Sequence, residues 1–140
     1  MGVTHIEHIG IAVKNLDQAV SLYEMILGIK CYKQEFIPEQ KVKTAFFKVG
    51  TIKIELLESS DPDGPVGRFI EKKGEGIHHI AFSVENIDVQ LRHYEQEGIG
   101  LIDDKPRKGA EGLDIAFLHP KSTAGVLIEI CEDKKELKNL

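Results

Sequence analysis

HIGIAVKNLD at residues 8–17 recurs as HIAFSVENID at residues 79–88, an offset of 71 positions. Further along, IKIEL at residues 52–56 matches VLIEI at residues 126–130, after a slightly longer connection in the second half. A repeat of this length is too long for a solenoid unit, and it occurs only twice. The sequence therefore predicts a duplicated module.

Each copy predicts the same order of elements. A β-branched run opens each copy as a strand, and a helix with apolar residues at helical spacing follows. Asn or Asp is available as the N-cap of each helix, and Gly28 and Gly98 stand where the helices should stop. Further strands are expected by pattern alone. The expected strands are residues 6–13, 30–36, 43–49 and 52–58, then 77–84, 101–103, 113–118 and 126–131.

The length and the repeat together predict one α+β domain built from two tandem βαβββ modules. A chain of 140 residues is large enough to bury a core as a single domain. Module one should occupy about residues 3–62 and module two about residues 75–133, with a linker helix within about 63–74. The Asp61–Pro65 stretch, rich in Pro, Asp and Gly, marks the end of the first module.

Composition narrows the classes of function. The net charge of −5 disfavours a nucleic-acid binder. No run reaches the roughly 20 apolar residues of a membrane span, and no basic leader opens the chain. Cys31 and Cys131 lie in no CxxC pattern, which predicts reduced thiols and a cytoplasmic location.

Strand alternation predicts an open surface beside two histidines. His8 shares one strand face with Gly10 and Ala12, and His79 shares one with Ala81 and Ser83. Bulky side chains at those positions would fill a pocket, whereas small ones leave the sheet surface open. One such histidine alone would more often be an ordinary core or edge residue.

Glu55 and Glu129 stand in the matching late strands, flanked by apolar residues. Burying an unpaired carboxylate costs several kcal/mol, so each needs a cation, a proton or a wet cavity. If the modules pack about a pseudo-twofold axis, two His and two Glu meet in one metal-centred cleft. The pattern therefore predicts one divalent cation with four ligands. These ligands are His8, Glu55, His79 and Glu129.

The other histidines and the tyrosines receive plainer interpretations. His5, His78 and His93 are expected to be exposed, and Tyr23 and Tyr94 to pack in the core beneath their helices. His119 belongs to a hairpin, where it either contacts a ligand or shapes the turn.

Two HIGIAV-like openings in paired βαβββ modules resemble the vicinal-oxygen-chelate superfamily over nearly the whole chain. That superfamily includes glyoxalases, extradiol dioxygenases, antibiotic-resistance proteins and methylmalonyl-CoA epimerases. Several segments in register resemble the epimerase family in particular. These are PEQ at 38–40, GEGIHHIAF at 74–82, DKPRKG at 104–109 with Gly112, and FLHPKS at 117–122 followed by GVLIE at 125–129.

The resemblance implies an epimerase acting on an acyl-CoA thioester, methylmalonyl-CoA, in propionate metabolism. Its cofactor would be one divalent ion (cobalt, manganese, nickel or zinc), and its common assembly is a homodimer. The position of Glu55 is Gln in some members. Glu129 is one candidate base. The position of Thr44 is Glu in some members, and threonine is a poor base, so Glu39 is the expected second base, with Glu55 or a metal-bound water as alternatives.

Four residues are expected to hold the carboxylate of the substrate: Gly109 and Gly112 through backbone amides, and Lys121 and Ser122. The neighbouring Arg107-Lys108 pair could reach the nucleotide phosphates.

Other functions remain open at this point. A glyoxalase would use the same metal positions on a glutathione hemithioacetal. A non-catalytic resistance-type protein would bind a small ligand in the cleft. An extradiol dioxygenase usually needs a longer chain and an iron site with two His and one carboxylate, which four protein ligands disfavour.

Overall fold

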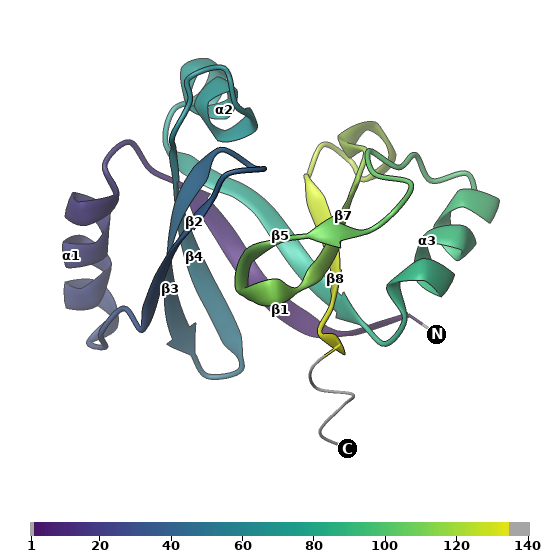
Figure 1. Ribbon diagram of the computed structural model, residues 1–140, viewed down its shortest axis with the longest axis horizontal. Coiled ribbons are helices and arrows are strands. Elements are labelled where there is room, and N and C mark those ends of the chain that lie inside the picture. The colour runs from purple at the N-terminus through teal and green to yellow at the C-terminus, as the bar shows by residue number, and fades with distance from the viewer. Residues whose placement is uncertain (1, 135–140) are drawn as a thin grey trace. The chain divides into compact units, whose positions relative to one another are not determined.

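The computed structural model describes residues 2–134, which contain eight β-strands and three α-helices (Figure 1). These residues divide into two compact units. The first unit is residues 8–78, and the second combines residues 2–7 with 79–134. The unit boundaries therefore fall inside strands, and the module limits predicted from the sequence stay a prediction.

The first unit holds a four-stranded sheet in the order β2-β3-β4-β1. Strand β1 runs parallel to β4, and the β2-β3-β4 pairs are antiparallel. Helix α1 follows β1, and helix α2 follows β4. The elements are β1 (Val3–Ala12, in this unit from residue 8), α1 (Leu16–Leu27), β2 (Lys33–Ile37), β3 (Val42–Val49), β4 (Ile52–Ser59) and α2 (Pro65–Lys73).

The second unit repeats this plan with the order β5-β8-β7-β6. Strand β5 runs parallel to β8, and β8-β7-β6 are antiparallel, so the predicted βαβββ plan is found in both units. The elements are β5 (Gly76–Val84, in this unit from residue 79), α3 (Ile87–Gln96), β6 (Arg107–Lys108), β7 (Asp114–Leu118) and β8 (Ile128–Glu132).

The prediction of a strand at residues 101–103 is wrong. Residues 101–103 contribute only an isolated bridge between Leu101 and Leu118, and the edge strand is the short β6 instead. The Asp103 carboxylate accepts the Phe117 N–H at 2.9 Å, so a side chain takes the backbone donor that a paired strand would have used.

Both helices that cross the sheets begin in the same way. Asn15 accepts a hydrogen bond from the Gln18 N–H, and Asn86 accepts one from the Val89 N–H, both at 3.0 Å. Each Asn has the extended backbone of an N-cap, as the sequence predicted. At the other end, Gly28 closes α1 in the left-handed conformation, with φ of 69°.

A carboxylate from the last strand of each repeat also caps the helix of that repeat. Glu58 Oε1 accepts the Leu16 N–H at 2.8 Å, and Glu132 Oε1 accepts the Ile87 N–H at 2.9 Å. Both glutamates stand three residues after Glu55 or Glu129 in the repeat. The duplication therefore preserves the attachment of helix to strand as well as the strands themselves.

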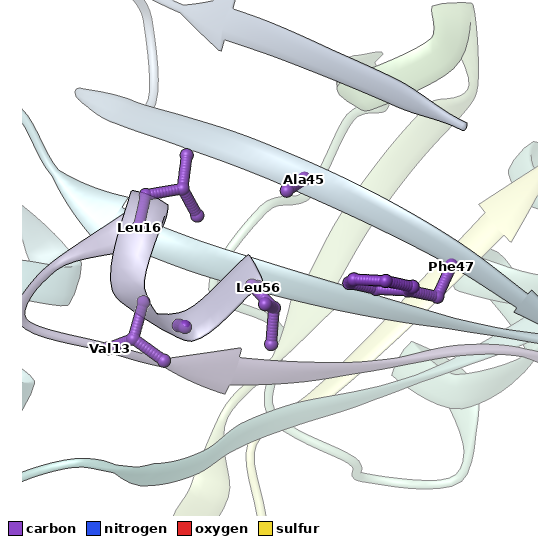
Figure 2. Packing of buried hydrophobic residues seen from close by; sticks show 6 residues of the cluster. Val13, Leu16, Ala45, Phe47 and Leu56 are labelled. Carbon is purple, nitrogen blue, oxygen red and sulfur yellow. The ribbon is translucent and has the colours of Figure 1, made fainter. Parts of the chain in front are cut away.

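The core of each unit lies between its helix and its sheet. Figure 2 shows side chains of α1, β3 and β4 meeting there, including Leu16, Ala45 and Leu56. Tyr23 packs against this cluster, and Tyr94 packs against the matching cluster beneath α3. The prediction that both tyrosines serve the core is confirmed.

Replacing Glu132 by Ala should lower the free energy of unfolding by about 1–3 kcal/mol, because a buried N–H of α3 loses its acceptor. Glu132→Gln keeps an acceptor oxygen and should lose distinctly less. Urea unfolding followed by circular dichroism measures both variants. Equal midpoints for Glu132→Ala and wild type would contradict the role of the cap.

Candidate metal centre

In the first unit, the parallel pairing of β1 and β4 brings His8 and Glu55 together. Gly10 lies opposite Glu55 in the register, so His8, two residues earlier, shares its sheet face. The Nε2 atom of His8 lies 3.8 Å from the Oε1 atom of Glu55. Only 3% of His8 and 4% of Glu55 is exposed. This face is the one opposite α1, because Leu56 belongs to the core beneath that helix.

The second unit builds an equivalent pair. Ala81 of β5 lies opposite Glu129 of β8 in a parallel register, which puts His79 on the same face. The Nε2 atom of His79 lies 3.6 Å from the Oε1 atom of Glu129, and both residues are buried. Each unit therefore carries one buried His–Glu pair on the sheet face away from its helix.

The geometry of each pair suits a shared cation. Separations of 3.6 and 3.8 Å exceed the usual length of an N–H···O hydrogen bond. Two ligands of one tetrahedral zinc ion stand about 3.4 Å apart, since each lies about 2.1 Å from the metal. Imidazole and carboxylate suit a borderline divalent ion. His8, His79 and Glu129 are all buried and offer ligand atoms that could hold a metal ion.

An aromatic ring stands opposite each candidate carboxylate in the sheet. Phe46 pairs with Glu55, and Phe117 pairs with Glu129. The Phe117 ring meets the His79 ring edge-on, with centroids 5.8 Å apart. The sequence reasoning did not assign a role to these rings. The repeat could have shown one, because Ala45-Phe46 and Ala116-Phe117 align at the same offset as the histidines.

A cation is held against the Phe117 ring. The Arg107 guanidinium carbon lies 5.7 Å from the ring centroid, and Arg107 Nε lies 3.3 Å from Asp103 Oδ1. Because Asp103 also accepts the Phe117 N–H, a single carboxylate positions both groups. Arg107 therefore lies beside the aromatic neighbour of His79.

The glycines expected to bind substrate shape a tight turn at Ala110–Gly112. The Gly109 N–H donates to the Leu113 carbonyl at 2.9 Å. Glu111 and Gly112 both have left-handed backbone, with φ of 58° and 73°. Two successive left-handed residues turn the chain sharply just before β7.

Lys121 and Ser122 lie in the short turn that follows β7. Ser122 Oγ accepts the Gly100 N–H at 2.8 Å, so it braces a neighbouring loop, while Lys121 is exposed. His119 Nδ1 accepts the Lys121 N–H at 3.1 Å. Of the two interpretations of His119, this contact supports the role in the turn.

The two candidates for the second base are placed differently from each other. Glu39 is exposed in the turn between β2 and β3. Thr44 is fully buried in β3, and its hydroxyl donates to the Glu35 carbonyl at 3.0 Å.

The prediction that His78 is exposed is wrong. His78 is half-buried, and its ring meets the Phe69 ring of α2 edge-on at 5.0 Å. Burial lowers the pKa of His78 to about 4. The helix α2 covers this position, which strand alternation alone could not show. His93 is half-buried beside Tyr94 rather than exposed, whereas His5 is exposed as predicted.

Comparisons with known proteins place the chain among relatives that cover most of its length. The family model for the glyoxalase/bleomycin resistance protein/dioxygenase superfamily matches residues 7–117. Uncharacterized protein YqjC of Bacillus subtilis is 46% identical over 98% of each chain. Mitochondrial methylmalonyl-CoA epimerase of Homo sapiens is 35% identical over 89% of this chain and 72% of its own.

The comparison with solved structures finds the same family. A variant of methylmalonyl-CoA epimerase from Streptomyces coelicolor, in complex with 2-nitronate-propionyl-CoA, matches with a TM-score of 0.91 at 37% identity. The match covers 94% of this chain and 96% of that one.

Among residues 2–134, no helix is both long and apolar enough to cross a membrane.

Gly109→Ala should destabilise the fold by about 1–3 kcal/mol, because overpacking of a buried side chain strains the core. An added Cβ would lie 2.8 Å from Ile115 Cδ1, and Ile115 is 2% exposed. In an Ile115→Ala background, which removes all three contacting atoms (Cδ1, Cγ2 and Cγ1), the same substitution should cost less. Urea unfolding of the four proteins in this double-mutant cycle measures the coupling; strictly additive effects would contradict the contact.

Proposed function

The chain belongs to the glyoxalase/bleomycin resistance protein/dioxygenase superfamily, and from this premise we propose that it is a metal-dependent methylmalonyl-CoA epimerase. Membership confirms the predicted α+β vicinal-oxygen-chelate fold. The similar proteins named as epimerases support an isomerase acting on an acyl-CoA. The observation that carries the proposal is the buried His–Glu pair found once in each unit of such a chain.

The proposed metal centre joins both pairs on one divalent cation, with His8, Glu55, His79 and Glu129 as ligands. Cobalt, manganese, nickel and zinc all accept nitrogen and oxygen ligands of this kind. Such an ion supplies Lewis-acid stabilisation of the negative charge that develops on substrate oxygens. The duplicated positions, the burial of all four side chains and the superfamily support this arrangement. The group of buried side chains that could hold one metal ion contains His8, His79 and Glu129 but not Glu55, so Glu55 has the weaker support.

The proposed reaction inverts C2 of methylmalonyl-CoA. The C2 proton lies between a thioester and a carboxylate, so its removal leaves an enolate with delocalised charge. In the proposal, the Glu129 carboxylate takes or returns that proton on one face, and a second group acts on the other. Glu39, the second base expected from the sequence, stays a prediction, and its exposed turn gives it no support.

The acyl-CoA contacts are also proposed. Lys121, Ser122 and the Gly109–Gly112 turn would hold the substrate carboxylate, and Arg107 and Lys108 the phosphates. The Gly109 N–H already donates to the Leu113 carbonyl and would have to give up that bond to reach a substrate. Support comes from the exposure of Lys121 and from the fixing of Arg107 by Asp103. Lys108 already pairs with Asp114 at 2.6 Å and would have to share its charge. A homodimer, a cytoplasmic location and a part in propionate metabolism likewise stay predictions.

Hydrogen–deuterium exchange at C2 of methylmalonyl-CoA in D₂O tests the reaction directly. We expect exchange with loss of stereochemical purity, abolished by chelator and restored by a divalent metal, because charge on the enolate needs the cation. NMR follows the exchange. The absence of exchange at every metal tested would reject the epimerase and direct attention to glutathione hemithioacetals and to non-catalytic ligand binding.

His79→Ala tests the metal centre. Loss of a group beside a metal ligand already costs about 10–100-fold in affinity, so loss of a ligand should cost at least that much. The exposed His5 provides the matched control, since His5→Ala should bind metal as wild type does. Elemental analysis after dialysis measures the metal content of both variants and so shows whether His79 is a ligand. Equal metal content in both variants would remove His79 from the site.

A further inference from the structure

We propose that Glu35 is the second acid–base group of the reaction, acting on the face of C2 that Glu129 does not reach. This inference rests on the proposed function, because it assigns one step of that reaction. It follows from which carboxylates the sheet of the first unit directs to the face of His8 and Glu55.

The register of the sheet places Glu35 on that face. Leu57, two residues after Glu55 in β4, lies opposite Thr44 in β3, and Thr44 lies opposite Glu35 in β2. Residues directly opposite in an antiparallel pair project on the same side of the sheet. Glu35 therefore shares its side with Glu55, one row along and two strands across.

Glu35 is the remaining strand carboxylate on this face. Within strands β1–β4 of residues 8–78, the carboxylates are Glu35, Glu55 and Glu58. Glu58 points to the opposite face, where it accepts the Leu16 N–H of α1. Glu55 belongs to the candidate metal centre. Among the strand carboxylates of residues 8–78, Glu35 is therefore the one on this face that is not a candidate metal ligand.

Thr44 cannot carry the proton itself. A threonine hydroxyl is a very weak acid and base near neutral pH, and the Thr44 hydroxyl already donates to the Glu35 carbonyl. Thr44 is short and fully buried, so neighbouring groups cover it on this face of the sheet. A Cβ-to-Cβ separation of about 4.5–5.5 Å between paired residues lets a longer side chain on β2 reach over a short one on β3.

The register also sets the distance between the two carboxylates of this face. Strands about 4.8 Å apart and a rise of about 3.4 Å per residue separate the Cα atoms of Glu35 and Glu55 by roughly 12 Å.

The surroundings of Glu35 suit repeated proton transfer. Its side chain is 30% exposed, so its proton can exchange with solvent between turnovers. Lys33 Nζ lies 3.5 Å from Glu35 Oε1 and orients the carboxylate along β2. Glu39, in contrast, lies beyond the end of β2 in an exposed turn, where no strand register directs its side chain.

The step balances without any further reactant. In one direction Glu35 removes the C2 proton, the electron pair of the C–H bond enters the enolate, and the Glu129 carboxylic acid delivers a proton to the other face. In the reverse direction the two residues exchange roles. After each turnover, solvent restores the starting protonation of both carboxyl groups.

The test follows each C2 isomer separately in D₂O, measuring deuterium uptake and conversion to the other isomer. Glu35→Gln should reduce conversion about 100-fold or more, while uptake continues from the one isomer whose proton Glu129 removes. Glu129→Gln should show the reciprocal pattern, provided that its metal content is restored. Glu71→Gln, at an exposed carboxylate of α2, is the matched control and should convert both isomers at the wild-type rate.

Several results would overturn the inference. Glu35→Gln with wild-type conversion, or Glu39→Gln showing the split between uptake and conversion, would each do so. If Glu35→Gln does not fold, Glu35→Asp replaces it and should retain partial conversion; full conversion would count against Glu35. Wild-type protein that exchanges neither isomer rejects the proposed function as a whole, whereas an active wild type with unaffected Glu35 variants rejects this assignment alone.

Discussion

A carboxylate buried in the middle of an apolar strand needs a partner that offsets the cost of removing its charge from water. This chain has two such carboxylates, Glu55 and Glu129. In each unit the compensation begins with a histidine on the parallel neighbour strand, with nitrogen and oxygen 3.8 or 3.6 Å apart. Much else follows from that pairing. The histidine must share the strand face with small residues, the parallel ladder needs a crossover helix, and the opposite face must be apolar to bury that helix.

The parts of the fold that the sequence predicted are those in which a local pattern repeats. The opening strands, the Asn caps and the core tyrosines were predicted because identical or similar residues recur at one offset. The missed parts depend on contacts between segments far apart in sequence. The loss of the strand at residues 101–103 depends on Asp103 capturing the Phe117 N–H, and the burial of His78 depends on Phe69.

The candidate site divides in the same way. All four proposed ligands were found from the sequence, because an apolar flank makes a lone Glu conspicuous and the duplication makes it significant. The role that we propose for Glu35 was not predicted, since a glutamate that follows Lys33 and Gln34 in an edge strand is not conspicuous in the sequence. Only the pairing of Glu35 with Thr44 distinguishes it from an ordinary surface carboxylate. The two copies have diverged at the level of neighbours: one sheet carries Glu35 with Lys33, the other Arg107 over Phe117.

An interval of three residues separates each candidate ligand from the helix-capping glutamate, so the two carboxylates of one strand point to opposite faces of the sheet. In β4, Glu55 faces the site while Glu58 holds α1, and in β8 Glu129 and Glu132 do the same with α3. A slip of one residue along either ladder would send both carboxylates to the wrong side together. Misaligned intermediates thus lose the helix anchor and the buried pair in a single event. The correct strand register is therefore favoured by two interactions that are lost together when the register shifts. An insertion or deletion between the two glutamates would uncouple these interactions.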